Sequence, residues 1–233
     1  LIETAAHAAV FETVELAAPR VRSLVNAILR RALREKSALT SAAEAEPLSV
    51  RFSIPDFLIE KWLRQFEAGE VVKLCQWNNA PPPIYARING LKTTLAEFLN
   101  DFPGSAPVPG SGQFVRLNDP AVATANGDCY IQDPSTALAC ELLQPAAGET
   151  VLDACAAPGG KTAHLAEMMQ NKGTLVAADL DEARLQRLRD NVVRLRVKNV
   201  RTVRCDWLDE ESIRCGQFTA RSFDKILVDA PCT

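Results

Sequence analysis

Short apolar runs divide the second half of the chain into regular units. Each run has the length of a strand, and those other than 200–205 are rich in Val, Leu, Ile and Ala. The runs cover 151–153, 174–178, 200–205 and 225–228. Between the second and third runs, apolar residues return at helical spacing over 182–195. Strands that are separated by helical or loop crossovers predict a mostly parallel sheet, so this half is expected to be an α/β domain.

The chain begins with a helical pattern. Apolar residues such as Leu24, Ile28 and Leu33 recur at helical spacing within 1–36, and most of the arginines lie off that stripe. Those arginines form either a solvated helix face or a surface that follows RNA phosphates, and the sequence favours neither. The stretch 37–49 is rich in Ala, Ser, Glu and Thr without an apolar period, which predicts a linker.

Two further helices are expected before the proline run at 81–83 ends the helical region. Ser53 is predicted to cap the first of them, with Pro55 in its first turn. Trp62 and Trp77 stand at positions where helical residues are mostly buried, so we expect them in the core. Stacking on nucleic-acid bases is the less favoured interpretation.

A small α+β unit follows the prolines. The stretch 84–88 alternates like a strand, and 113–117 predicts another. Between them, Thr94 and Glu97 form a capping-box pair for a short helix. Asp133, with Pro134 after it, then predicts the start of a helix that leads into the α/β domain.

The stretch T-V-L-D-A-C-A-A-P-G-G-K-T, residues 150–162, carries the candidate chemistry. It indicates a strand, a glycine-bearing loop and a helix, an arrangement that brings backbone N–H groups close to a ligand. Its end resembles a phosphate-binding loop, but Cys155 stands where that motif requires glycine and Pro158 lacks an N–H. The spacing of a dinucleotide-binding G-x-G-x-x-G motif is absent.

A loop that binds S-adenosylmethionine fits the sequence better. Such a site needs an acidic residue for the ribose hydroxyls about 20 residues beyond the loop, and Asp179 lies 19 residues after Gly160. Asp153, Asp206 and Asp229 follow the other predicted strands. Carboxylates gathered at one sheet edge would repel a phosphate but tolerate a cationic sulfonium. An ordinary tight turn with a surface aspartate is the alternative.

Composition limits the remaining possibilities. The chain has 233 residues, of which 47% are hydrophobic and 24% charged, as expected for a globular protein with a core. The net charge of −3 means that any RNA site must be a local basic patch. The seven cysteines include no C-x-x-C pair, which argues against a disulfide framework or a zinc site. The same cysteine usage fits a reducing cytoplasm, so we expect a cytoplasmic protein without a metal. No apolar run approaches the roughly 18 residues of a membrane span, so no membrane partner is expected.

Two motifs carry a resemblance to a known family. D-A-C-A-A-P-G-G-K-T at 153–162, together with V-D-A-P-C-T at 228–233, resembles the RNA 5-methylcytosine methyltransferases of the Fmu/Sun/nucleolar-protein family. The resemblance implies a Rossmann-like methyltransferase sheet at 129–233, truncated after its fourth strand. It further implies an RNA-recognition-like α+β module at 46–128, and at 1–45 the end of a NusB-like helical domain plus a linker.

The resemblance also assigns roles to residues. It implies a cofactor site for S-adenosylmethionine made of the central loop and three strand-end carboxylates. These residues are Cys155, Ala156, Ala157, Pro158, Gly159, Gly160, Lys161, Asp179, Asp206 and Asp229. Gln132 and Asp133 are expected beside that site, and Arg87, Asn89 and Lys92 are candidate RNA contacts.

The implied reaction is methyl transfer to C5 of a cytosine in small-subunit (16S-type) ribosomal RNA. A cysteine thiolate adds to C6 and makes C5 nucleophilic, which is covalent catalysis. In the family, Cys232 corresponds to an accessory Pro-Cys cysteine, whereas the main nucleophile belongs to a later Thr-Cys motif that should lie beyond Thr233. We therefore expect a fragment of a longer enzyme that is inactive alone. Among the possible oligomeric states, a monomer is favoured.

Other functions are less favoured. A non-catalytic RNA-binding or assembly module is the alternative, because the Thr-Cys motif is absent from this sequence. An amino-group methyltransferase would need an Asp/Asn-Pro-Pro-aromatic motif where this chain has Asp229-Ala230-Pro231-Cys232.

Overall fold

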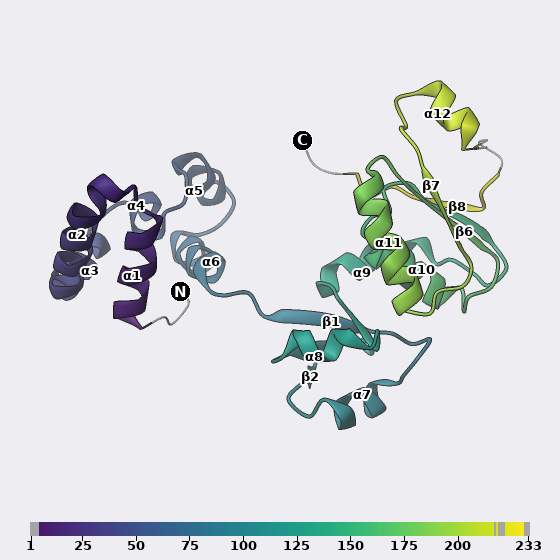
Figure 1. The fold of residues 1–233 in the computed structure, drawn as a ribbon, viewed down its shortest axis with the longest axis horizontal. Coiled ribbons are helices and arrows are strands. Elements are labelled where there is room, and N and C mark those ends of the chain that lie inside the picture. The colour runs from purple at the N-terminus through teal and green to yellow at the C-terminus, as the bar shows by residue number, and fades with distance from the viewer. Residues whose placement is uncertain (1–4, 217, 219–221, 231–233) are drawn as a thin grey trace. The chain divides into compact units, whose positions relative to one another are not determined.

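The computed structural model describes residues 5–216, 218 and 222–230. The chain divides into two units, Leu1–Pro82 and Pro83–Thr233 (Figure 1). The first unit is helical, and the second carries two β-sheets with their helices.

The first unit contains α-helices at the positions that the apolar stripes predict, and two more that they do not. The helices are α1 (Ala6–Leu16), α2 (Arg22–Arg34), α3 (Lys36–Glu44), α4 (Leu48–Phe52), α5 (Asp56–Leu63) and α6 (Ala68–Asn79), with a 3-10 turn η1 at Pro19–Val21. The two that the stripes do not predict are α3 and α4. Ile59, Val71 and Cys75 form a buried cluster, against which Trp62 packs. The identity of residues 1–45 as the end of a NusB-like domain plus a linker stays a prediction.

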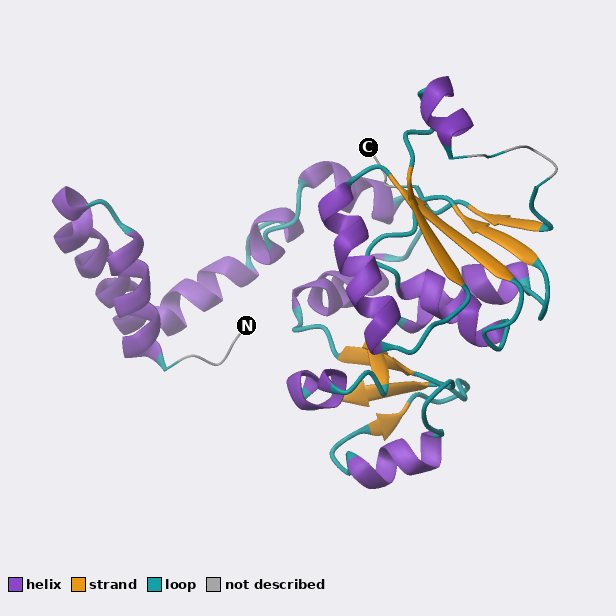
Figure 2. Cartoon of the chain, turned by 45° about the vertical axis from the view of Figure 1, so that its right-hand side comes forward, coloured by secondary structure: helices purple, strands orange, loops and turns teal. Residues whose placement is uncertain are grey.

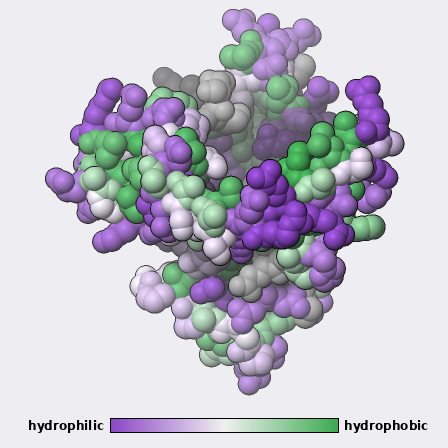
Figure 3. Space-filling model, turned by 90° about the vertical axis from the view of Figure 1, so that its left-hand side faces the viewer, coloured by the Kyte–Doolittle hydropathy of each residue, from purple (hydrophilic) through white to green (hydrophobic). Residues whose placement is uncertain are grey.

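Three local predictions in this unit are wrong. The expected linker at 37–49 is largely helix, because Ala-rich sequence favours α3 by local propensity although none of its residues is buried. Ser53 does not start a helix but ends α4 in the left-handed region, at φ 54°, and Pro55 precedes α5. Trp77 is 72% exposed rather than core. The space-filling view shows hydrophobic areas between hydrophilic ones on the surface (Figure 3).

An antiparallel sheet opens the second unit, with strand order β2-β3-β1-β4 (Figure 2). Its strands are β1 (Ile84–Ile88), β2 (Ala106–Pro107), β3 (Phe114–Leu117) and β4 (Cys129–Ile131). Helix α7 (Leu95–Asp101) begins with the predicted capping box between Thr94 and Glu97, and α8 (Pro120–Ala125) precedes β4. Phe98 of α7 packs against Ala86 and Val115 in the core of this module.

A parallel sheet follows, as the alternating pattern predicts. Within the described residues it has strand order β7-β6-β5-β8. The strands are β5 (Thr150–Asp153), β6 (Thr174–Asp179), β7 (Val200–Arg204) and β8 (Lys225–Leu227), and every pairing is parallel. The helices are α9 (Ala137–Leu143), α10 (Gly160–Met168), α11 (Glu182–Arg194) and α12 (Glu210–Cys215), with η2 (Pro134–Thr136) capped by Asp133 as predicted.

The strand order determines where a ligand can bind. From β5 the chain moves outward through β6 to β7 and then returns to place β8 on the other side of β5. This reversal is a topological switch point, and in open α/β sheets ligands bind beyond the carboxyl ends of the strands at that point. Asp153 ends β5, and the loop 154–159 that follows lies at this switch point.

Candidate functional site

The conformation of the loop between β5 and α10 depends on two glycines and on one backbone hydrogen bond. Gly159 has φ +104°, a left-handed conformation that side chains disfavour. A Cβ on Gly160 would lie 2.7 Å from Cε1 of Tyr130, so only glycine permits this packing. The Ala156 N–H donates to the Ala178 carbonyl at 2.9 Å and ties the loop to β6.

The main cavity lies at the carboxyl ends of the strands and measures about 630 Å³. It is bounded by the loop, by the residues that follow β6 and β7, and by the segment after β8. These are Ala154, Cys155, Ala157, Asp179, Leu180, Asp181, Arg184, Cys205, Asp206, Trp207, Leu208, Asp229 and Ala230. Three of the four predicted strand-end carboxylates therefore share one cavity.

Asp179 is the most closely held of these carboxylates. Its side chain is about 5% exposed, Oδ2 accepts from the Ala157 N–H at 3.0 Å and Oδ1 accepts from the Asp181 N–H at 3.2 Å. Arg184 donates to the Ala157 carbonyl at 2.6 Å and covers the same part of the loop. Each carboxylate oxygen keeps a lone pair for a ligand hydroxyl, since an ionised carboxylate accepts about four hydrogen bonds.

Asp153 is the last residue of β5, directly before the loop, and does not line the main cavity. It is almost fully buried, and its Oδ2 accepts from the Thr162 hydroxyl at 2.7 Å. Burial raises the pKa of the Asp153 carboxyl to about 6, against the opposing effect of Thr162. This carboxylate therefore supports the loop, and its Oδ1 has no hydrogen-bond partner in the described part of the chain.

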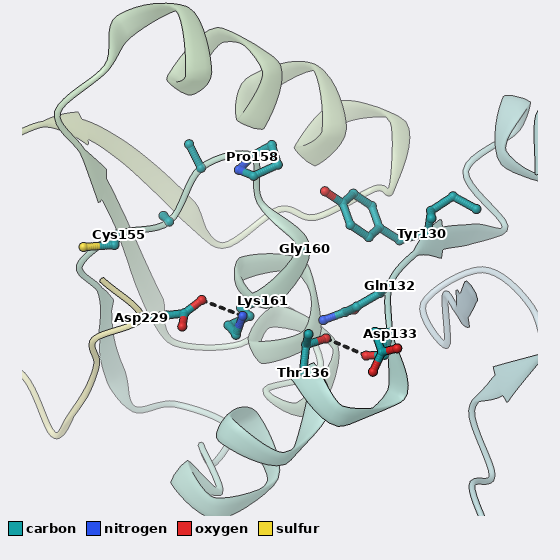
Figure 4. A pocket seen from close by; sticks show the side chains of 12 residues that line it. Tyr130, Gln132, Asp133, Thr136, Cys155, Pro158, Gly160, Lys161 and Asp229 are labelled. Carbon is teal, nitrogen blue, oxygen red and sulfur yellow. Dashed lines mark hydrogen bonds and ion pairs between the residues drawn. The ribbon is translucent and has the colours of Figure 1, made fainter. Parts of the chain in front are cut away.

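A side cavity of about 250 Å³ adjoins the main cavity (Figure 4). The two share Cys155, Ala157 and Asp229. The other residues that line the side cavity come from β4 and the turn after it, from η2, from the loop and from the start of α10. They are Tyr130, Ile131, Gln132, Asp133, Thr136, Ala156, Pro158, Gly160 and Lys161. Lys161 Nζ forms an ion pair with Asp229 Oδ2 at 2.6 Å, which places a charged pair at the junction of the two cavities.

The predicted RNA contacts are wrong for Arg87, in β1, and for Asn89, directly after β1. Both side chains are about 1% exposed. Arg87 donates to Gln132, to Glu167 of α10 and to the Gly160 carbonyl, whereas Asn89 donates to the carbonyls of Gly127 and Leu195. These polar groups therefore join the antiparallel module to the parallel sheet.

Lys92 is also engaged within the protein. Its side chain is about 9% exposed and its Nζ lies 2.9 Å from Asp128 Oδ1. A residue held in this way is a poor candidate for an RNA phosphate contact.

The structure brings most of the predicted site residues together. Nine line the main or the side cavity, namely Cys155, Ala156, Ala157, Pro158, Gly160, Lys161, Asp179, Asp206 and Asp229. Gly159 shapes the turn between them, and Gln132 and Asp133 line the side cavity. Cys232 lies outside the described residues.

Sequence reasoning missed several lining residues. Trp207 donates its Nε1–H to the Ala154 carbonyl at 2.6 Å, and Leu180 and Leu208 form apolar walls of the main cavity. Each directly follows a strand-end aspartate or lies two residues beyond it, so the same switch-point argument could have selected them. Tyr130 had no comparable signal, because its contact with Gly160 depends on the packing of distant segments.

Cys155 is half-buried at the junction of the cavities. Burial and the neighbouring carboxylates Asp179 and Asp153 raise the pKa of its thiol, which disfavours the reactive thiolate. Four other cysteines, Cys75, Cys129, Cys140 and Cys205, are buried. His164 on α10 is buried as well, and burial lowers its pKa to about 3, so it stays neutral.

Across 5–216, 218 and 222–230, no helix has both the length and the apolar character needed to cross a bilayer. In the same residues, no group of three or more His, Cys, Asp or Glu side chains has the arrangement of a metal site.

Comparison with family models gives two matches. The family described as 16S rRNA methyltransferase RsmB/F matches residues 140–233, which include the parallel sheet. The ferredoxin-like domain of RsmF/B-like methyltransferases matches residues 54–104, which include α5, α6, β1 and α7.

Similar proteins extend the match to nearly the whole chain. The chain is 35% identical to the probable ribosomal RNA small subunit methyltransferase B of Bacillus subtilis, over 97% of its length and 53% of that protein. It is 36% identical to the ribosomal RNA small subunit methyltransferase B of Pseudomonas putida, over 98% of its length and 54% of that protein. The chain thus spans about half the length of these curated relatives.

Solved structures of similar proteins also match most of this chain. The structure of PH0851 matches with a TM-score of 0.73 and 27% identity, over 96% of this chain and 52% of that one. A methyltransferase homolog protein from Pyrococcus horikoshii matches with a TM-score of 0.66 and 31% identity, over 80% of this chain and 62% of that one.

Proposed function

The chain belongs to the family of 16S rRNA methyltransferases RsmB/F, as its two motifs predict, and from this premise we propose that it forms part of an enzyme that methylates small-subunit ribosomal RNA. The methyl donor would be S-adenosylmethionine and the acceptor C5 of a cytosine. The observation that supports this most strongly is the main cavity at the switch point, where Asp179, Asp206 and Asp229 meet. The working environment would be the cytoplasm.

The residues of the main cavity suit this cofactor. A volume of about 630 Å³ falls in the range of cavities that hold small molecules and cofactors. Asp179 would accept the ribose hydroxyls, Leu180, Trp207 and Leu208 would flank the adenine near Asp206, and the loop 155–161 would surround the methionine part. When bound, the cofactor supplies an electrophilic methyl group on a cationic sulfur, which nearby carboxylates attract.

The chain's own residues would bind, orient and shield the reacting groups. The Lys161–Asp229 pair lies where the two cavities meet and would hold the target base against the methyl donor. Cys232, three residues after Asp229, would assist product release. The nucleophile that adds to C6 would be the cysteine of a later Thr-Cys motif, which this sequence does not contain.

A methyl-transfer assay tests this proposal. The full-length protein expected to contain this chain is incubated with radiolabelled S-adenosylmethionine and small-subunit ribosomal RNA, and the modified nucleoside is identified by mass spectrometry. We expect 5-methylcytidine, strongly reduced in Asp229→Ala and unchanged in Asp190→Ala, whose carboxylate lies on the exposed face of α11. Methylation at another atom would refute the assigned chemistry, and specific RNA binding without turnover would favour the assembly module.

A further inference from the structure

The side cavity is smaller than the sites that hold drug-sized ligands. Its volume of about 250 Å³ lies below the range of about 300–1,000 Å³ that accommodates drug-sized ligands. It opens next to the main cavity, with which it shares Cys155, Ala157 and Asp229. A base in the side cavity would therefore lie beside a methyl donor in the main cavity.

Gln132 reaches into this cavity from the end of β4, and its side chain is well buried, at about 8% exposure. Its Oε1 accepts from the Nε–H of Arg87 at 2.9 Å. A guanidinium can only donate, so the carbonyl oxygen of this amide must face Arg87 and the amide nitrogen must face the opposite way. Figure 4 shows that nitrogen directed into the cavity, toward the side where Lys161 lies.

Arg87 is itself held in place. Its guanidinium is about 1% exposed, pairs with Glu167 of α10 and donates to the Gly160 carbonyl at 3.3 Å. These bonds fix Arg87 relative to both the antiparallel module and the central loop. Because Arg87 cannot rotate freely, the Gln132 amide is fixed as well.

The Gln132 amide nitrogen faces open space. In the described part of the chain its Nε2 makes no hydrogen bond to another residue, and it is not among the fully buried side-chain atoms that lack a partner, so it is accessible from the cavity. A donor that lines a cavity pairs with water or with a ligand. A ligand in the side cavity should therefore present an acceptor toward Gln132.

We propose that Gln132 is a specificity-determining residue, and that its amide N–H donates to N3 of the target cytosine. This inference rests on the proposed function. N3 of cytosine is an acceptor, whereas N3 of uracil carries a hydrogen. In a uracil of the same orientation, the N3–H would face the Gln132 N–H, and two donors cannot pair. The fixed amide thus distinguishes the two pyrimidines.

Nuclear magnetic resonance on the isotopically labelled chain tests this directly. With S-adenosylmethionine present, cytidine 5′-monophosphate should shift the side-chain amide signals of Gln132, and uridine 5′-monophosphate should not. Signals that stay unmoved by the cytidine nucleotide, or that move equally with both nucleotides, overturn the inference.

The variant Gln132→Glu supplies the matched test. It keeps the shape and an acceptor for Arg87 but removes the donor. Affinity for the cytidine nucleotide should fall about 10- to 100-fold, the range for losing a base-specific hydrogen-bond pair. Gln76→Glu makes the same charge change on the exposed surface of α6 and should have no effect. Equal affinity in wild type and Gln132→Glu overturns the inference.

A calorimetric titration with S-adenosylmethionine separates this inference from the proposed function. If the cofactor binds to wild type and to Gln132→Glu but the nucleotide results are negative, the role of Gln132 alone is wrong. If the folded wild type does not bind the cofactor, the proposed function fails first, and the inference fails with it.

Discussion

Replacing Arg87 by methionine should destabilise the second unit severely. Arg87 is the cation of a buried pair, and the Glu167 side chain is only about 6% exposed. Methionine preserves much of the apolar volume but leaves Glu167 with a single long contact, from the Gly90 N–H at 3.4 Å. Gln132 and the Gly160 carbonyl lose a donor at the same time. Removing one partner of a buried pair costs about 3–5 kcal/mol.

The double variant Arg87→Met/Glu167→Met should recover most of that loss. Replacing both partners of a buried pair by apolar side chains is often neutral, because no uncompensated charge stays behind. Urea unfolding followed by fluorescence measures the difference. The three tryptophans are Trp62, Trp77 and Trp207, so a background in which the first two are phenylalanine reports on the second unit alone.

The loss caused by Arg87→Met should depend on pH. Burial raises the pKa of Glu167, and the charge of Arg87 opposes that rise, so the pKa should climb further in the variant. A carboxyl whose pKa is higher in the folded state binds more protons there, and stability falls as pH rises through the folded pKa. The destabilisation should thus be larger at about pH 8 than at about pH 5. A loss below about 1 kcal/mol, or a double variant no more stable than the single one, would refute this reasoning.

Two further changes test the support of the central loop. The pKa of Asp153 is raised to about 6 in the folded state, so the stability of the wild type should fall by up to about 3 kcal/mol as pH rises from about 4 to 6. Thermal unfolding of Asp153→Asn across this range should lack that decline. A variant with the same pH profile as wild type would contradict the raised pKa of Asp153. Gly160→Ala places a Cβ 2.7 Å from the Tyr130 ring and should lower the free energy of unfolding in urea by about 1–3 kcal/mol. The double variant Gly160→Ala/Tyr130→Leu should recover much of this loss. An equal loss in the double variant would exclude the clash with Tyr130 as its cause.

The parallel sheet and its central loop were predictable because their signals are local. Most of the strands are short apolar runs, and Asp153 and Asp179 stand at the last position of their strands. The switch-point rule then places the cavity without knowledge of packing. The same locality explains why the capping box of Thr94 and Glu97 was confirmed.

The polar interior was not predictable in this way. Arg87 looks like a surface residue at the end of a strand, but its ion-pair partner, Glu167, is 80 residues away in sequence. Its burial depends on how the antiparallel module packs on α10, which no local pattern encodes. The orientation of Gln132 follows from Arg87 and was hidden for the same reason.

The most direct test of the account is a calorimetric titration of the chain with S-adenosylmethionine. We predict saturable binding by wild type and by Asp190→Ala, and an affinity about 10- to 100-fold lower for Asp179→Ala, because its carboxylate supplies charged hydrogen bonds to the ribose. Circular dichroism establishes that all three proteins are folded. Equal affinity in Asp179→Ala, or no binding by the folded wild type, would contradict the assignment of the main cavity as the cofactor site.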